Sequence, residues 1–269
     1  MILTTITVYW NRPDMLKRWL RAIEGAKHPE VRHTLFVVGD KTPDGVYSTQ
    51  NLEIWEDTNQ IPGVTSIGHF HNLGAKITDT PWMMKLDLDA LPNVRYFQEL
   101  IPLLKSASPR QWFNGGMFYV GRVGSQRHLT APQMPVSEDT YLTITEKETH
   151  LLGPFSEPAG SNFICRRQDY LDLGGCLEGF SGYGWEDYQQ LYMLEKYWRE
   201  QCPLTGHIDE FNVTQACRDQ ISRLKAKQLW EINPWLGLLH CWHPRGPITS
   251  SKINANRKLL WDYIKKDLP

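Results

Sequence analysis

The start of the chain switches from one hydrophobic spacing to another. Residues 2–8 form an alternating run with both isoleucines and the valine on one face, which predicts a β-strand. Over residues 15–23 the apolar positions recur every three or four residues, which predicts an amphipathic helix. Asn11 stands before this helix as its expected cap. Pro13 suits the first turn, because proline lacks an N–H that would be unsatisfied there.

A second apolar run, over residues 34–38, predicts a short buried strand that ends near Asp40. A strand, a helix and a strand in this order are the usual opening of a parallel α/β sheet. Ligands of such sheets bind beyond the carboxyl ends of the strands. Asp40 stands at such an end and is therefore a candidate binding residue.

Later periodicities extend this pattern and predict a single domain with a mainly parallel, Rossmann-like α/β sheet flanked by helices. Further strands are expected over residues 82–86, 112–120, 161–165 and 235–241, the second of them interrupted by Gly115-Gly116. Further helices are expected over residues 72–78, 94–104, 186–198, 220–230 and 253–263. Residues 123–158 show no clear period, so a long surface excursion is expected there.

The composition indicates a globular protein without a charge bias. Of the 269 residues, 41% are apolar, which is enough for a sizeable core and argues against disorder. The formal net charge of −1 argues against nonspecific coating of nucleic acid, which requires a basic excess. No stretch approaches the roughly 20 apolar residues that span a bilayer.

The five cysteines are odd in number, and none of them shows C-x-x-C spacing. This pattern favours free thiols in a reducing compartment over a disulfide framework. Together with the lack of an expected transmembrane segment, it predicts a cytoplasmic protein.

The first segment with candidate chemistry is Lys85-Leu86-Asp87-Leu88-Asp89, directly after an apolar strand. In an extended segment, side chains two residues apart point the same way, so both carboxylates could face one divalent cation or one metal–diphosphate complex. Mg²⁺ and Mn²⁺ prefer such oxygen ligands. The alternative is a solvated turn after the strand, because Asp-x-Asp alone is common.

The second segment is Gly179–Tyr188, in which glycines surround aromatic residues before the acidic pair Glu186-Asp187. Glycines allow a ligand to approach the backbone closely. The acidic pair opens an expected helix, where exposed N–H groups favour carboxylates, so the pair could serve only as a helix cap. The functional alternative is a general base that takes a proton from an acceptor hydroxyl.

The third segment is Leu239–Pro244, which holds His240 and His243 after a late strand. Neutral imidazole is a good ligand for Mn²⁺ or Zn²⁺. Two histidines at this spacing could equally be structural or merely exposed.

Together the three segments resemble the GT-A glycosyltransferases, close to the family 2 enzymes and to the β4-galactosyltransferase and polypeptide N-acetylgalactosaminyltransferase groups. The similarity covers most of the chain, and the order and spacing of its motifs fit. These motifs are Thr7–Arg12, Asp40, Asn72–Lys76, Asp87–Asp89, Gly174–Gly175, Gly179–Phe180, Gly184–Asp187 and His240–His243. The family's common Trp-Gly-Gly-Glu-Asp stands here as Tyr-Gly-Trp-Glu-Asp over residues 183–187.

The resemblance implies a metal site and a catalytic base. Asp89 would bind Mn²⁺ or Mg²⁺ together with His243, and His240 is a second candidate ligand. Asp187 would be the base, with Glu186 holding a donor or acceptor hydroxyl.

The resemblance also implies a site for a nucleotide-sugar donor, preferably a UDP-sugar. In it, Asp87 would contact the ribose or the sugar and Asp40 the base. The other implied donor-site residues are Tyr9, Arg12, Asn72, Gly74, Lys76 and Trp185. Residues 1–122 would form the nucleotide-sugar-binding half, 123–158 a variable loop, and 159–269 the acceptor and catalytic half with C-terminal helices.

The implied reaction is transfer of the sugar to an acceptor hydroxyl with inversion at the anomeric carbon, because a base opposite the leaving group gives inversion. The acceptor could be a glycan, a lipid carrier, a protein or a modified nucleic-acid base. One alternative is a sugar nucleotidyltransferase, although the Gly-rich, basic loop that usually opens those enzymes is missing from residues 10–14. Another is a non-catalytic carbohydrate-binding protein.

Overall fold

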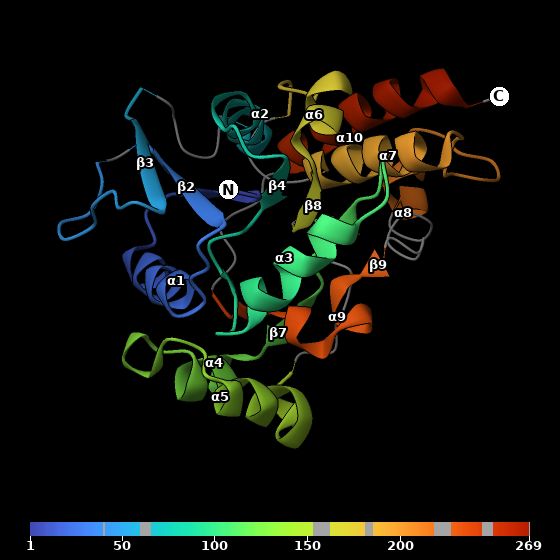
Figure 1. Ribbon diagram of the computed structural model, residues 1–269. Helices are drawn as coiled ribbons and strands as arrows, with labels where there is room; N and C mark the ends of the chain where they lie inside the picture. Colours follow the sequence, from blue (N-terminus) through green and yellow to red (C-terminus); the bar gives the residue numbers. More distant parts are fainter. Residues whose placement is uncertain are drawn as a thin grey trace.

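The computed structural model describes residues 1–39, 41–59, 66–152, 162–180, 185–217, 227–243 and 250–268. Within these residues, a seven-stranded mixed sheet lies between two layers of helices, and a three-stranded sheet lies beside it (Figure 1). This arrangement confirms the α/β expectation.

The large sheet has the strand order β3-β2-β1-β4-β8-β6-β9. The first four strands in this order are parallel to one another: β3 (Leu52–Asp57), β2 (Val31–Val38), β1 (Leu3–Tyr9) and β4 (Trp82–Lys85). The last three strands follow an antiparallel step from β4 to β8: β8 (Phe163–Arg166), β6 (Phe113–Asn114) and β9 (Lys227–Gln228). The parallel part places the carboxyl ends of β1 and β4 at one edge.

The small sheet has the order β5-β10-β7. Its strands are β5 (Ala90–Leu91), β10 (Leu238–Cys241) and β7 (Met117–Val120). Because β5 begins five residues after β4 ends, this pairing brings the late strand β10 to the carboxyl edge of the large sheet.

The helices cover both faces of the large sheet (Figure 1). On one face lie α1 (Pro13–Gly25) and α3 (Tyr96–Ser106). On the other lie α2 (Ile67–Ile77), α6 (Arg167–Asp172), α7 (Glu186–Arg199) and α10 (Ser250–Ile264). The shorter helices are α4 (Arg122–His128), α5 (Glu138–Leu142), α8 (Val213–Ala216) and α9 (Leu229–Ile232).

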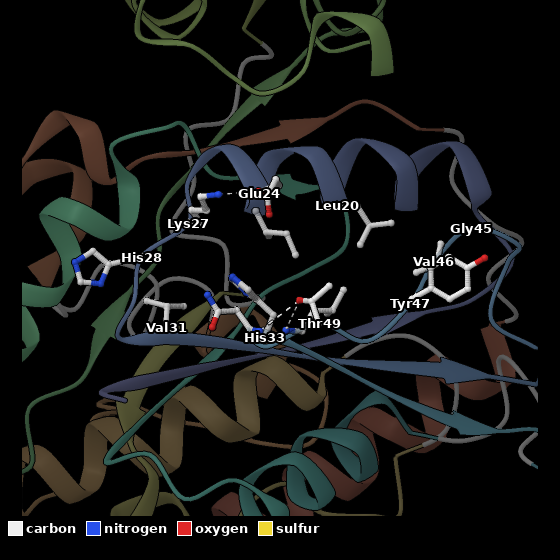
Figure 2. Close-up of a pocket in the computed structure, with 13 residues that line it drawn as sticks. Leu20, Glu24, Lys27, His28, Val31, His33, Gly45, Val46, Tyr47 and Thr49 are labelled. Atoms are coloured by element: carbon white, nitrogen blue, oxygen red, sulfur yellow. Dashed lines mark hydrogen bonds and ion pairs between the residues drawn. The ribbon is translucent and has the colours of Figure 1, made fainter.

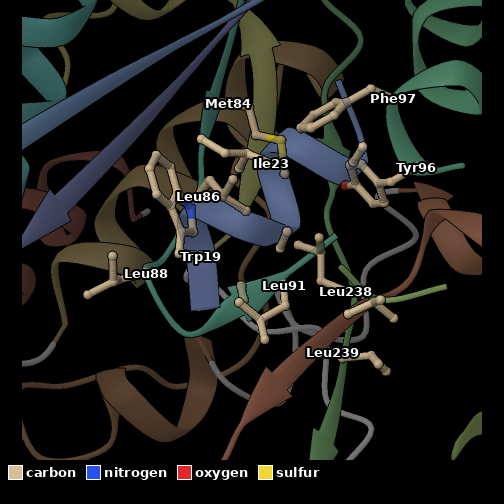
Figure 3. Packing of buried hydrophobic residues seen from close by; sticks show 14 of the residues in the cluster. Trp19, Ile23, Met84, Leu86, Leu88, Leu91, Tyr96, Phe97, Leu238 and Leu239 are labelled. Carbon is tan, nitrogen blue, oxygen red and sulfur yellow. The ribbon is translucent and has the colours of Figure 1, made fainter. Parts of the chain in front are cut away.

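Strand alternation divides the core into two clusters, one on each face. Along β2, Leu35 and Val37 join the cluster under α1 and α3, whereas Phe36 and Val38 join the one under α2 and α7. Figure 3 shows the first cluster continuing from Trp19 of α1 to Leu239 of β10, so the small sheet shares this core. Full burial of each such side chain contributes roughly 1.5–3 kcal/mol.

The opening of the chain folds as predicted, except for the cap of the first helix. β1 and α1 occupy the expected residues, and Pro13 stands at the start of α1. The N-cap is Arg12, without a side-chain cap hydrogen bond, and Asn11 has a left-handed φ of 42°. The expectation that Asn11 caps α1 is therefore wrong.

Three later expectations are corrected. The strand expected over residues 112–120 is interrupted at Gly115-Gly116, as predicted, but its two parts, β6 and β7, lie in different sheets. Residues 123–152 hold α4, α5 and a π-helical turn, because helices of five to seven residues are too short to show a period. Residues 227–232 form β9 and α9 in place of the end of one helix. The remainder of that expected helix, residues 220–226, lies outside the described residues.

Two features bear on the expected compartment. All five cysteines are free thiols, as predicted. Among the described helices, none has the length and apolar character of a membrane span. The cytoplasmic location stays a prediction.

Candidate metal and catalytic centre

Asp89 lies at the carboxyl edge of β4, and strand pairing brings two histidines to it. His240 pairs with Ala90 in the β5–β10 ladder, and the amide of Cys241 donates to the carbonyl of Asp89 over 2.8 Å. The backbone thus fixes His240 beside Asp89, and His243 follows three residues later. These residues are about 150 positions apart in sequence, so only the tertiary fold can assemble the group.

The side chains of Asp89, His240 and His243 converge. His243 Nε2 lies 2.7 Å from Asp89 Oδ2, and His240 Nε2 lies 3.6 Å from Asp89 Oδ1. One ligand atom from each residue can be chosen so that all lie within 4.8 Å of one another. A carboxylate with two imidazoles suits Mn²⁺ or Zn²⁺, so these residues could hold a divalent ion.

The protonation of this group favours ligation. Burial alone would raise the pKa of Asp89, but the hydrogen bond from His243 and the nearby imidazoles and Arg12 outweigh burial and lower it. Burial lowers the pKa of His240 more than the nearby Asp89 carboxylate raises it. Asp89 is therefore ionised and His240 neutral at pH 7, as metal ligands must be.

Arg12 and Tyr9 reach the same edge from the end of β1. Arg12 Nη1 lies 3.3 Å from Asp89 Oδ2, and its side chain is 42% exposed, so it can also meet an anionic ligand. Tyr9 is the last residue of β1 and lies buried in the core cluster under α1.

The two aspartates of the Asp-x-Asp segment do not share one direction. The chain turns there, because the amide of Ala90 donates to the carbonyl of Asp87 over 3.0 Å, and Asp89 alone joins the two histidines among the described residues. The expectation that both carboxylates face one ion assumed an extended segment and is corrected by this turn. The amide of Asp87 itself is held by Asn162 Oδ1 at 2.9 Å.

The acidic pair Glu186-Asp187 forms the first turn of α7, as predicted. Asp187 Oδ1 forms an ion pair with Nζ of Lys85, the last residue of β4. The side chain of Asp187 is 27% exposed, whereas Glu186 is buried. Asp187 is thus fixed to the carboxyl edge of β4 and still has access to solvent.

Trp185 precedes this turn in a left-handed conformation, with φ of 74°, and its side chain does not cap the helix. Its ring stacks on Tyr188 with centroids 5.5 Å apart. The neighbouring residues 183 and 184, and also Asp40, lie outside the described residues.

Asn72 and Gly74 make contacts within the protein. Asn72 Oδ1 accepts from the amide of Cys176 at 2.8 Å and from the hydroxyl of Tyr170 at 2.9 Å. Asn72 Nδ2 donates to the carbonyl of Cys176 at 2.8 Å. Gly74 packs on β1, where a β-carbon would come within 2.7 Å of Ile6. These contacts tie α2 to the turn after α6 and to the sheet.

Lys76 lies away from the metal group. It is exposed in the last turn of α2, and its carbonyl accepts from Arg167, which directly follows β8. Because Arg166 of β8 pairs with Trp82, this turn lies at the start of β4, whereas Asp89 follows its end. The structure does not bring Lys76 to the other site residues.

Sequence analysis assigned no role to Lys85 or Asn162, which hold Asp187 and Asp87 in place. A signal for Lys85 was available, because a lysine that ends an apolar run is rarely buried without a carboxylate partner. Asn162 carried no such signal.

A cavity lies away from this centre. A cavity of about 290 Å³ opens between the end of α1 and the beginnings of β2 and β3, with His28, His33 and Tyr47 among its lining residues (Figure 2). It therefore lies near the amino ends of these strands, whereas Asp89 and Lys85 lie at the carboxyl edge.

The fold defined by these elements is that of the GT-A glycosyltransferases. The structure of GalNAc-T7 with UDP, GalNAc and Mn²⁺ matches 72% of this chain and 40% of its own length, at 14% identity and a TM-score of 0.50. This match confirms the expected GT-A fold. No protein-family model and no curated protein matches the chain.

Two other solved structures are similar at lower TM-scores. The catalytic domain of Drosophila β1,4-galactosyltransferase 7 with xylobiose matches 72% of this chain and 61% of its own, at 12% identity and a TM-score of 0.41. Glucosyl-3-phosphoglycerate synthase from Mycobacterium tuberculosis, with Mn²⁺, UDP-glucose and phosphoglyceric acid, matches 74% of this chain and 67% of its own, at 14% identity and a TM-score of 0.43. This chain thus matches less than two thirds of the length of the galactosyltransferase and of GalNAc-T7.

Proposed function

We propose that this chain is a metal-dependent glycosyltransferase that moves a sugar from a UDP-sugar to an acceptor hydroxyl, with inversion at the anomeric carbon. The observation that carries the proposal is the convergence of Asp89, His240 and His243 at the carboxyl edge of β4 in a GT-A fold. GalNAc-T7, which has the same fold, was solved with UDP, GalNAc and Mn²⁺, and this supports a UDP-sugar and Mn²⁺, or Mg²⁺, here.

Asp89, His240 and His243 would hold the ion. When bound, the divalent cation would stabilise the negative charge that develops on the leaving diphosphate. Arg12 offers a second, partly exposed cation to the same anion from beside Asp89. In this proposal, Asp87 and Trp185 contact the donor, with Tyr9 and Asp40 nearer its nucleoside.

Asp187 serves as the general base. The acceptor oxygen forms a bond to the anomeric carbon, while the bond from that carbon to the diphosphate breaks and leaves its electron pair on the diphosphate. The hydroxyl proton passes to Asp187. Asp187 is assigned this role over Glu186 because of their exposure to solvent. The Asp187 side chain is 27% exposed, whereas Glu186 is 3% exposed and therefore less accessible to an acceptor.

A screen of nucleotide-sugar hydrolysis with Mn²⁺ tests the proposal without requiring the acceptor. UDP-sugars, GDP-sugars and other donors are incubated with the wild type and with Asp89→Asn, and the released nucleotide is measured. Release of nucleoside diphosphate by the wild type alone is expected. Release of pyrophosphate would indicate a nucleotidyltransferase, and donor binding without turnover would indicate a carbohydrate-binding protein.

The donor found in this way then allows the acceptor to be identified. Glycans, lipid carriers, proteins and nucleic acids with modified bases are offered with that donor, and the linkage formed is read by NMR. An inverted anomeric configuration is expected, and a retained one would remove Asp187 from the role of base in a single displacement.

A further inference from the structure

Lys85 is a charged residue in a place where charge is costly. It ends the central strand β4, and the whole residue is 2% exposed. Lysine is almost never fully buried unless it is paired, because removing an ammonium group from water costs several kcal/mol. Its Nζ pairs with Asp187 Oδ1, which lies 102 residues later in the first turn of α7.

The groups around Lys85 make it a single cation among carboxylates. Asp187 and Glu186 face it from α7, and Asp87 faces it from the end of β4. Burial alone would lower the pKa of Lys85, but these three carboxylates outweigh burial and raise it, so Lys85 stays charged.

The two other titratable neighbours of Lys85 carry no charge near pH 7. Burial lowers the pKa of His71 on α2, and the charge of Lys85 lowers it further. Burial and the nearby Glu186 raise the pKa of the Cys176 thiol to about 12. Of Lys85, His71 and Cys176, only Lys85 therefore carries a positive charge beside these carboxylates.

We propose that Lys85 is a positioning residue of the transfer reaction, which holds the Asp187 carboxylate aimed at the acceptor hydroxyl without touching a substrate. The inference rests on the proposed function, in which Asp187 is the base. Burial keeps Lys85 itself from reaching a substrate, whereas the partner carboxylate remains partly exposed.

Two physical needs explain the pairing. Three neighbouring carboxylates repel one another, so a cation between them offsets this repulsion and holds them together. The first turn of α7 also receives no side-chain cap from Trp185, and the ion pair fixes this turn to the central strand. Lys85, at the end of β4, provides both the positive charge and the anchor for α7.

The test compares Lys85→Met, which removes the charge at similar length, with Lys85→Arg, which retains it. For each variant, kcat and kcat/KM of transfer are measured against pH, together with calorimetric donor binding in Mn²⁺ and melting temperature. Lys196→Met is the matched control. Lys196 lies in the last turn of α7, at the other end from Asp187, and its Nζ pairs with the carboxylate of Asp267 at 2.6 Å.

In Lys85→Met we expect a lower kcat, donor binding within about twofold of wild type, and an acid limb of the pH–rate profile moved to higher pH. The limb should move in this direction because loss of a paired cation disfavours an ionised carboxylate. Lys85→Arg should keep the wild-type acid limb with a reduced kcat, because the guanidinium restores the charge in a different geometry. Lys196→Met should leave the limb unchanged.

An unmoved acid limb in Lys85→Met, with only a lower melting temperature, would overturn the inference and leave Lys85 a structural residue. If Lys85→Met does not fold, Lys85→Arg decides, since a wild-type kcat in that variant would contradict positioning. Failure of the proposed function looks different: the wild type would then transfer no sugar, or Asp187→Asn would retain full transfer, and the inference would fall with it.

Discussion

Thermal stability in the presence of Mn²⁺ gives the most direct test of the group formed by Asp89, His240 and His243. A ligand that binds only the folded state at 100 times its Kd stabilises that state by about 2.7 kcal/mol. For a chain of this size, such a gain raises Tm by roughly 5–11 °C. The wild type should show this rise in a titration that needs neither donor nor acceptor.

Each histidine variant should weaken this response. Removing one of three ligands should raise the half-saturating Mn²⁺ concentration at least 10- to 100-fold, the loss typical for the outer partners of a metal site. At the same Mn²⁺ concentration, the stabilisation then falls to about 1.4 or 0.4 kcal/mol. His243→Ala should have the larger effect, because His243 also holds Asp89 Oδ2 at 2.7 Å, whereas His240 lies 3.6 Å from Oδ1.

The matched control is His128→Ala. His128 pairs with Glu148 at 2.8 Å, and its side chain is 20% exposed, as is that of His243. This control should lower the baseline Tm without changing the Mn²⁺ midpoint. If His240→Ala and His243→Ala also change only the baseline, the two imidazoles merely pack, and the metal site is refuted.

Four further outcomes follow from named contacts. Excess chelator should abolish transfer, and Mn²⁺ should restore it at least as well as Mg²⁺; full turnover in chelator would exclude a metal role. Asp187→Asn should reduce kcat on the order of 10²–10⁴-fold with donor Kd unchanged by calorimetry, and near-normal transfer would remove Asp187 from the mechanism. Asn72→Ala should cost about 1–3 kcal/mol in urea unfolding, because the Cys176 amide and the Tyr170 hydroxyl both lose Asn72 Oδ1 as an acceptor; weaker donor binding at unchanged stability would instead assign Asn72 to the donor site. Burial lowers the pKa of His33 to about 3, so the unfolded chain binds the proton more readily and stability should fall as pH drops below about 6.5, by roughly 2 kcal/mol between pH 7 and 5; His33→Gln should flatten this slope, and an equal slope would contradict the assignment.

Local periodicity was sufficient for the elements whose pattern is long. β1 and α1 were predicted because a strand period of two and a helical period near 3.6 were each sustained for several residues. β3 was missed because only Leu52 is buried and its other positions carry acidic and partly exposed side chains. The interruption at Gly115-Gly116 was predicted, but the assignment of β6 and β7 to different sheets was not predictable, since tertiary pairing determines it.

The residues of the candidate site were likewise predicted only in part. Asp89, His240, His243, Glu186 and Asp187 were named from motif order, and the fold brings the first three together. Lys85 was quoted in the same motif but received no role, because its partner is 102 residues away and nothing local indicates the pairing. Motif spacing identifies candidate metal ligands and bases more readily than it identifies the residues that position their side chains.

The turn at Asp87-Leu88-Asp89 explains how one short segment can serve two parts of the proposed reaction. It directs Asp89 toward the histidines of β10, while Asp87 remains among the carboxylates that act on Lys85. The Cα atoms of Lys85 and Asp89 are four peptide units apart, so they can be separated by at most about 14 Å. In the proposed function, the base held by Lys85 and the group that would hold the ion are thus both fixed to the carboxyl end of β4. Lengthening this turn by one residue should therefore separate metal binding, which would survive, from transfer, which would be lost; retention of full transfer by the insertion variant would show that the two groups do not act on one substrate.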